Sequence, residues 1–376
     1  MNRRTTGLIS VAMAVVLVTV GLWPFDFRPP DRVSWLENRA GLSFRPNGIV
    51  YTPEAADWSG GGLPENPAAF TLELWLEPGR VPATDLFDIL TIDDGVNAPG
   101  MVLFQWHTDL ALRVRDRASR RGFREVGPSS FLAEQAPRFV TMVVDAAGTT
   151  FFANGARLES YPGFTVPNSE LHGRLLLGDA AAGKHPWSGN LFGLAFYHRA
   201  LAASEVADHY TLWTNQQAGQ LAAEPTLAAL YRFDEGHGPW VNDLSTNRYR
   251  LLIPERYEVL RKRVLELPWG PDPIGLSELD DIAINILGFL PFGFIVYFCR
   301  RRITPDERGR AVVWAVCLGA TVSLVIELIQ VWLPDRTSSA TDLFCNTLGA
   351  FLGAVLAKKM QSRTIPKGST SETSPC

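Results

Sequence analysis

Cysteine is nearly absent from this chain, and no charge of either sign dominates it. The 376 residues include four cysteines, which are Cys299, Cys317, Cys345 and Cys376. The long stretch before Cys299 has none, which argues against a disulfide-stapled secreted domain there. The net charge is −4, and 20% of the residues are charged. This balance gives no reason to expect a nucleic-acid partner.

Long apolar runs are present in four places. A bilayer-spanning helix needs about 20 predominantly apolar residues. The predicted transmembrane helices are residues 7–25, 281–299, 311–333 and 339–357. The first follows a basic start, but residues 22–26 are bulky where a signal-peptide cleavage site would need small residues. We therefore expect an uncleaved anchor, and the lipid bilayer is a predicted partner.

Basic residues in the short connections predict the orientation of these helices. They gather at the N-terminus, between the second and third helices, and in the tail: Arg3, Arg4, Arg300, Arg301, Arg302, Arg308, Arg310, Lys358, Lys359, Arg363 and Lys367. The connection 335–342 carries only Arg336. We therefore expect the N-terminus, residues 1–6, and a disordered tail, residues 358–376, to be cytoplasmic. Residues from about 26 to 280 should be extracytoplasmic.

Residues 40–250 have the alternation and the turn signals of short β-strands. Phe70–Leu76 and Leu110–Arg115 alternate between the two faces of a strand, and Asn154-Gly155 is typical of a tight hairpin turn. Regular short strands of this kind predict an all-β antiparallel sandwich. The segment Tyr231–Gly236, with Asp243 after it, is interpreted as a strand that closes the sandwich.

A connector at residues 254–268 follows the predicted sandwich. Its apolar residues recur at helical spacing: Tyr257, Leu260, Val264 and Leu267. This pattern predicts an amphipathic helix, which either lies near the outer head groups or packs as a plain connector.

Parts of the predicted sandwich resemble the laminin-G-like, concanavalin A-like lectin/glucanase jelly roll. The stretches that carry the resemblance are Phe70–Pro78, Phe151–Gly155, Trp187–Leu191 and Tyr197–Leu201. The resemblance implies binding of an envelope glycan or a protein. Candidate ligand-binding residues are Trp106, His107, His185 and Trp187, although we favour packing roles for the tryptophans.

Acidic residues of this domain give little sign of catalysis or of a metal. Glu73 and Glu77 flank Trp75 without the intervening aspartate of a glucanase motif, so we interpret both as edge or solvated positions. Asp179 is a candidate calcium contact, but a calcium site needs several oxygen ligands. We expect no cofactor and assign no catalytic or other metal-binding residue.

Polar residues near the ends of the predicted helices form the most informative pattern. The predicted topology gathers them at the outer leaflet: Asp281, Asn285, Glu327, Gln330, Arg336, Asp342 and Asn346. A carboxylate facing lipid costs about 2 kcal/mol or more, so Glu327 should face partners, with Arg336 as the available cation. Gly349 and Gly353 should allow close approach of two helices.

This membrane pattern is similar to the VanZ-like family. The matching stretches are Trp23–Phe25, Asp281–Gly293, Glu327–Gln330, Arg336 and Asp342–Gly349. The resemblance implies a multi-pass protein of the bacterial inner membrane, with a link to glycopeptide resistance. In this chain the jelly roll would be inserted between the first and second helices of a four-helix bundle.

Three functional hypotheses follow from these patterns. The first is a non-enzymatic envelope protein whose jelly roll binds a glycan or a protein. The second is a membrane enzyme acting on a lipid-linked or cell-wall glycan, with Glu327 or Asp342 as acid or base. The third is a purely structural envelope protein, whose polar residues only lock the helices together. We rank the first ahead of the third, because a carboxylate within the membrane is by default a functional candidate. The second ranks last, because no nucleophile–base pair, phosphate loop or metal-ligand cluster supports an enzyme.

Overall fold

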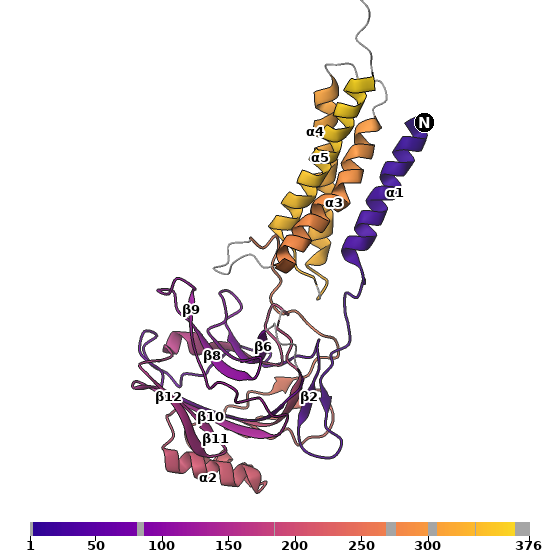
Figure 1. Ribbon diagram of the computed structural model, residues 1–376. Helices are drawn as coiled ribbons and strands as arrows, with labels where there is room; N and C mark the ends of the chain where they lie inside the picture. The colour runs from indigo at the N-terminus through magenta and orange to yellow at the C-terminus, as the bar shows by residue number, and fades with distance from the viewer. Residues whose placement is uncertain are drawn as a thin grey trace, which may run out of the picture. The chain divides into compact units, whose positions relative to one another are not determined.

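The chain divides into two compact units, each with its own class of secondary structure (Figure 1). The computed structural model describes residues 3–80, 86–183, 185–267, 276–299, 307–334 and 336–364. Residues 28–261 form the sandwich unit, and residues 1–27 with 262–376 form the helical unit. The predicted combination of an antiparallel sandwich and a helical bundle is confirmed.

The first sheet of the sandwich runs in the order β1-β2-β14-β5-β10-β11-β12, and β15 also pairs with β14. Its strands are β1 Ser34–Trp35, β2 Leu42–Phe44, β5 Phe70–Pro78, β10 Arg138–Asp145, β11 Gly148–Ala153, β12 Ala156–Pro162, β14 Gly189–Tyr197 and β15 Leu227–Tyr231. The predicted closing strand, Tyr231–Gly236, is misplaced, because the strand that pairs with β14 is β15, Leu227–Tyr231, and residues 232–236 are irregular. Asp243 accepts a hydrogen bond from the Leu230 backbone N–H at 2.9 Å, which ties the segment after β15 to that strand.

The second sheet runs in the order β16-β17-β3-β13-β6-β7-β8-β9, and β4 also pairs with β13. Its strands are β3 Val50–Tyr51, β4 Ala56–Asp57, β6 Leu86–Asp93, β7 Met101–Trp106, β8 Asp109–Arg115, β9 Phe123–Val126, β13 His172–Leu177, β16 Trp240–Val241 and β17 Leu251–Leu252. All strand pairs in both sheets are antiparallel.

Alternation along the strands explains why the two sheets stack. Phe70, Leu72 and Leu74 on β5 point into the main core between the sheets, where their exposure is 1% or less. The intervening residues of β5 face the other side of the sheet. The β11–β12 turn at Asn154 and Gly155 has positive φ angles of 50° and 80°, which these two residue types tolerate best.

One helix covers the outer face of the first sheet. This helix, α2 (Ala203–Thr214), lies against β10 and β11 and is followed by the 3-10 helix η2 (Ala218–Ala223); a second 3-10 helix, η1 (Asn168–Leu171), precedes β13 (Figure 1). Val206 and Trp213 of α2 are buried against Phe139 and Tyr197 of the sheet. A second apolar core therefore lies between α2 and the sheet.

The two ends of the sandwich unit are hydrogen-bonded to each other. The backbone N–H of Tyr257 donates to the carbonyl of Pro29 at 2.9 Å, and the Arg256 guanidinium donates to the carbonyl of Arg28 at 3.2 Å. Chain entry and chain exit are therefore neighbours within this unit.

The helix predicted within residues 254–268 is wrong. Residues 254–267 are irregular: the Tyr257 hydroxyl donates to Asp179 at 2.6 Å, and Arg261 forms an ion pair with Asp93. A short isolated helix is marginal in water, so these side-chain contacts with the sandwich outweigh the helical spacing.

The helical unit contains α1 (Arg3–Leu22), α3 (Leu276–Phe298), α4 (Glu307–Gln330) and α5 (Ala340–Thr364). Three of these are long and apolar enough to cross a membrane, over Leu279–Phe298, Glu307–Gln330 and Ala340–Ser362. The apolar part of α1, Gly7–Leu22, is shorter. The prediction of four spans therefore stays a prediction. The disordered tail predicted from residue 358 is wrong at its start, because residues 358–364 belong to α5. Arg300, Arg301, Arg302 and Lys367, with the tail beyond residue 364, lie outside the described residues.

Glycine allows α5 to approach α3 closely, as the sequence predicted. A Cβ atom on Gly349 would overlap the carbonyl oxygen of Ile286, and one on Gly353 would overlap that of Leu290. Gly293 of α3 meets the α5 backbone in the same way. The two helices therefore pack backbone to backbone, which only glycine permits.

A leucine at Gly353 should destabilise the helical unit, because its side chain has no room between α3 and α5. Overpacking of this kind typically costs about 1–3 kcal/mol. The matched control is Gly288→Leu, because Gly288 has nothing within 4 Å of an added Cβ. Thermal unfolding of the purified chain in detergent should show a lower midpoint for Gly353→Leu only. Equal midpoints would contradict the close packing of these helices.

Candidate functional site

The polar residues singled out in the helical unit lie toward one end of it. They occupy the beginning of α3, the end of α4, the beginning of α5 and the segment between α4 and α5 (Figure 1). Contacts that join different segments are Gln330 Nε2 to Gly21 O at 2.8 Å, Arg336 to Trp23 O at 3.1 Å, Asn346 Nδ2 to Ser323 Oγ at 3.0 Å, and Asn285 to the Asp342 carboxylate. Asp281 is exposed.

Glu327 of α4 is the most deeply buried acid of this group, with 1% of its surface exposed. Its carboxylate accepts a hydrogen bond at 2.7 Å from the backbone N–H of Ser339, which directly precedes α5. The Ser339 hydroxyl in turn accepts the N–H groups of Thr341 and Asp342. The positive end of the α5 dipole thus faces the carboxylate, which is a favourable place for a buried anion.

The ion pair expected between Glu327 and Arg336 is not formed among the described residues. Arg336 instead donates a hydrogen bond to the Trp23 carbonyl. It also lies close enough to Asp342 for a favourable electrostatic interaction with that carboxylate. From the sequence we expected the Glu327 carboxylate to pair with a cation. A sequence does not show that a backbone N–H at the start of a helix is available to bind a carboxylate instead. These contacts suit a lock between helices, and a ligand-binding role for the group stays a prediction.

The ligand candidates chosen from the sequence of the sandwich have unequal access to solvent. Trp106 is 49% exposed, and its ring meets that of His107 edge-on at 5.1 Å. The His185 ring lies 3.4 Å from the Asp88 carboxylate. Trp187 is completely buried, and its indole N–H donates to Gln105 at 2.9 Å. Trp187 is therefore a core residue that a ligand cannot reach.

Asp179 uses its carboxylate oxygens inside the protein. It accepts hydrogen bonds from the backbone N–H groups of Ala180 and His185 and from the Tyr257 hydroxyl. Burial raises its pKa to about 7, which makes it a poorer ligand for a cation at neutral pH. Within the described residues, no group of three or more histidine, cysteine or acidic side chains could hold a metal ion.

Glu73, interpreted from the sequence as an edge or solvated residue, is fully buried, and that prediction is wrong. It lies in β5, the strand between β14 and β10, and faces α2. Its carboxylate accepts hydrogen bonds from His209 Nδ1 at 2.8 Å, Trp213 Nε1 at 3.0 Å and the Tyr197 hydroxyl at 3.2 Å. Three donors compensate the lost hydration of the carboxylate, so burial is tolerated.

The charge of Glu73 acts on His209 across the interface of the sheet with α2. Burial by itself lowers the pKa of His209, but the hydrogen bond to Glu73 and the negative charge of that residue outweigh it, so the pKa is raised. When the imidazole is protonated, His209 and Glu73 form a buried ion pair, and Glu224 is a more distant second acid at 3.6 Å from Nε2 of His209.

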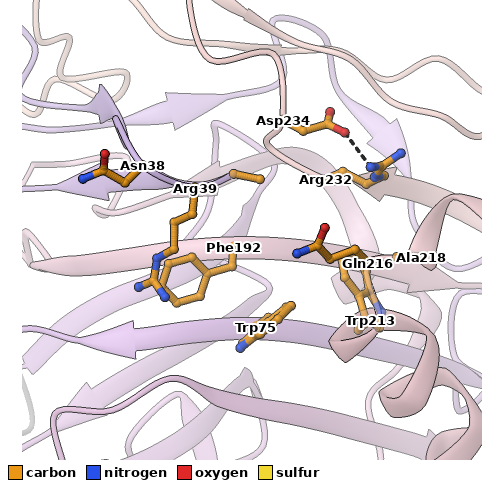
Figure 2. A pocket seen from close by; sticks show the side chains of 10 residues that line it. Asn38, Arg39, Trp75, Phe192, Trp213, Gln216, Ala218, Arg232 and Asp234 are labelled. Atoms are coloured by element: carbon orange, nitrogen blue, oxygen red, sulfur yellow. Dashed lines mark ion pairs between the residues drawn. The ribbon is translucent and has the colours of Figure 1, made fainter.

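A cavity of about 410 Å³ opens beside this buried pair, on the α2 side of the first sheet (Figure 2). Its lining residues are Asn38, Arg39, Ala40, Trp75, Phe192, Trp213, Gln216, Ala218, Arg232 and Asp234. They come from the β1–β2 connection, β5, β14, α2 and the segments after α2 and β15. We call this cavity the aromatic pocket.

Trp75, Phe192 and Trp213 form the aromatic floor of the pocket, and contacts with neighbouring side chains hold them in place. Trp75 and Phe192 meet edge-on at 5.8 Å, and the Arg39 guanidinium lies 3.7 Å from the Phe192 ring centroid (Figure 2). Trp213 is fixed by its hydrogen bond to Glu73, and its ring covers Gly193, where any Cβ would overlap it. The pocket is therefore preformed by the same contacts that hold α2.

Two ion pairs partly neutralise the cations at the rim of the aromatic pocket. Arg39 pairs with Glu77 at 2.8 Å. Arg232 pairs with Asp234 at 2.8 Å, as Figure 2 shows. Asn38 and Gln216 are exposed beside them. The pocket thus combines an aromatic floor with amide and guanidinium donors at its rim.

The sequence reasoning missed this pocket, although one signal pointed toward it. Trp75 stands in register with Glu73 and Glu77 on the face of β5 that points away from the core residue Leu74. A large aromatic residue on that face needs a cover or a ligand. The covering residues come from segments far along the chain, so only the fold brings them together.

The family comparisons agree with this two-part architecture. Residues 54–207 match the Concanavalin A-like lectin/glucanases superfamily, and residues 228–361 match VanZ/LLP1. The chain therefore carries both domains that the sequence resembled, and the VanZ/LLP1 match includes three helices that are long and apolar enough to cross a membrane. The VanZ/LLP1 match begins within β15 and covers α3, α4 and α5 as far as residue 361, whereas Trp23–Phe25 lies outside it.

Several solved structures are similar to part of this chain at low identity. The binding domain of Paraclostridial Mosquitocidal Protein 1 is 15% identical, with a TM-score of 0.35 over 50% of this chain and 47% of that chain. A SAP-like pentraxin from Limulus polyphemus is 13% identical, with a TM-score of 0.32 over 47% of this chain and 79% of that chain. The Botulinum neurotoxin serotype D binding domain is 11% identical, with a TM-score of 0.36 over 49% of this chain and 45% of that chain. No curated protein matches the chain.

Replacement of Glu73 by leucine should destabilise the sandwich unit strongly. It removes three hydrogen bonds and leaves the buried donors of His209, Trp213 and Tyr197 without their acceptor, a loss of roughly 3–5 kcal/mol. The matched control is Glu77→Leu two residues further along β5, which breaks a partly exposed ion pair worth at most about 1 kcal/mol. Thermal unfolding of the purified full chain, followed by near-ultraviolet circular dichroism, compares the two. Similar losses for both variants would refute the special role of Glu73.

Proposed function

We propose that this chain is a membrane-anchored, non-enzymatic protein of the bacterial envelope whose sandwich unit binds a saccharide in the aromatic pocket. The observation that carries the proposal is the combination of a preformed aromatic floor with amide and guanidinium groups at the rim. The match of this unit to a lectin/glucanase superfamily supports it.

The chemistry of the pocket fits a sugar ring. The C–H face of a pyranose packs on an aromatic ring such as that of Trp75, which is partly exposed, whereas the Phe192 ring is buried beneath the Arg39 guanidinium. The hydroxyls of a sugar need hydrogen-bond donors and acceptors nearby. Asn38, Arg39 and Gln216 are exposed side chains that offer both at the rim. These residues replace Trp106, His107, His185 and Trp187 as our primary ligand candidates.

The acids near the pocket favour binding over cleavage. Glycoside hydrolysis generally uses two carboxyl groups on either side of the scissile bond, roughly 5–10 Å apart. Among the described lining residues the only acid is Asp234, and it is paired with Arg232. The alternative of a membrane enzyme on a lipid-linked glycan has no comparable support from this pocket.

The helical unit would hold the saccharide-binding unit at the membrane. We propose that both termini are cytoplasmic and that the sandwich unit is extracytoplasmic, because basic residues favour the connections on the cytoplasmic side. We further propose that the polar group around Glu327 serves the same envelope role. A part in glycopeptide tolerance rests on the VanZ/LLP1 similarity of residues 228–361.

Loss of Trp75 should abolish saccharide binding by the intact protein. Full-length chain in detergent is applied to an array of bacterial envelope glycans, with Trp75→Ala, Arg39→Ala and the control Trp106→Ala. The first variant removes the stacking surface, and the second removes a rim donor whose side chain is 47% exposed. Each should lose at least roughly tenfold in affinity, as a lost stacking or charged contact of 1.4 kcal/mol predicts.

The control decides which surface of the sandwich is used. Trp106→Ala should bind like the natural chain, because Trp106 does not line the aromatic pocket. If Trp106→Ala loses binding and Trp75→Ala keeps it, the ligand site lies at the Trp106–His107 surface. If the natural chain binds no glycan, the saccharide proposal fails.

The proposed orientation gives opposite results at two insertion points. A periplasm-active reporter placed at Gly61, an exposed loop position of the sandwich unit, should be active. The same reporter at Thr304, between α3 and α4, should be inactive, and a cytoplasm-active reporter should behave in reverse. Activity of one reporter at both positions would refute the topology.

A further inference from the structure

A second cavity, of about 460 Å³, lies in the helical unit at the end away from Glu327. Its lining residues are Arg308, Gly309, Val312, Phe351, Val355, Lys358, Lys359 and Ser362, from the first turns of α4 and the last turns of α5. Three of these side chains are cationic, and no acid is among the lining residues that the structure describes. We call this cavity the basic pocket.

The cations of the basic pocket are available to a ligand. The Nε atom of Arg308 is buried and has no hydrogen-bond partner within the described part of the chain. Lys358 and Lys359 are exposed, and no ion pair between described residues uses any of the three cations. A buried guanidinium N–H without a partner is costly, so an anion with oxygen acceptors would complete the site.

The apolar wall of the basic pocket runs along the membrane-spanning part of the helices. Val312 lies one turn further into α4 than Arg308, and Phe351 precedes Lys358 by about 10 Å of helix. Phe351 is 42% exposed. The cations therefore stand at the end of a span, where lipid phosphates lie, and the apolar residues stand at the depth of acyl chains.

From this arrangement we infer that the basic pocket binds the phosphate of an anionic phospholipid, with an acyl chain along Val312, Phe351 and Val355. Basic pockets between transmembrane helices have the charge and the position that phosphorylated lipid head groups need. Arg308 supplies a planar donor for two phosphate oxygens, and the two lysines supply positive charge. This inference does not depend on the proposed saccharide binding.

Native mass spectrometry of the purified full chain tests the inference with two lipids of equal chain length. Phosphatidylglycerol should be retained in preference to the zwitterionic phosphatidylcholine. Arg308→Gln should weaken phosphatidylglycerol binding roughly fivefold, as expected for one cation at a membrane surface. The matched control is Arg310→Gln, which removes the same charge from the same helix but does not line the pocket. It should change the affinity by less than about twofold.

Further arms keep the test decisive. Lys359→Gln, at an exposed position, should also weaken binding, and it covers the case in which Arg308→Gln fails to fold. An excess of inorganic phosphate should leave the bound lipid in place; displacement by phosphate alone would show a free-phosphate site and overturn the lipid assignment. Equal retention of the two lipids, or an equal loss for Arg308→Gln and Arg310→Gln, would overturn the inference as well.

Discussion

One buried carboxylate organises the sandwich of this protein. Glu73 has no exposed surface, and all three of its hydrogen-bond donors come from elements more than 120 residues later in the chain. An unpaired carboxylate in that position would cost several kcal/mol, so β5 is stable in its place only when β14 and α2 are also in theirs. Trp213, one of the donors, is also a wall of the aromatic pocket. Folding of the domain and construction of its binding surface therefore depend on the same atoms.

Local sequence pattern was sufficient to predict most of the fold, but it did not predict most of the contacts in the candidate site. The strands followed from period-two alternation, as in Phe70–Leu76, and the hairpin turn followed from Asn154-Gly155, because both signals are carried by neighbouring residues. The burial of Glu73 is decided by α2, which no neighbour of Glu73 in the sequence reveals. Glu327 was correctly expected to need partners, but its partner is the backbone of Ser339 rather than an arginine. Contacts of this kind depend on the assembled fold.

The two ends of the helical bundle use their polar groups differently. At the end with Glu327, side-chain amides and carboxylates form hydrogen bonds between different segments of the unit, such as the one from Gln330 to the Gly21 carbonyl. The glycines of α5 bring its backbone against α3 nearby, so this end is held by close packing as well as by hydrogen bonds. At the other end, Arg308 and two lysines share a cavity without an acid among its described lining residues. One end of the bundle therefore directs several of its polar side chains to contacts within the unit, although Gln330 Oε1 and Asn346 Oδ1 are buried there without a described partner. The other end presents cations without a described acid.

The pairing of the sandwich's two chain ends explains how so large a domain can stand between two helices. Because Tyr257 is hydrogen-bonded to Pro29, the sandwich enters and leaves the chain at neighbouring points. The sandwich unit comprises the 234 residues from 28 to 261. Because its two ends are neighbours, the folded unit connects the helices as a short loop would. The entropy cost of closing such a long loop is met when the sandwich folds. A domain whose chain ends are neighbours can be replaced, during evolution, by another domain with neighbouring ends, and α1 and α3 need not change.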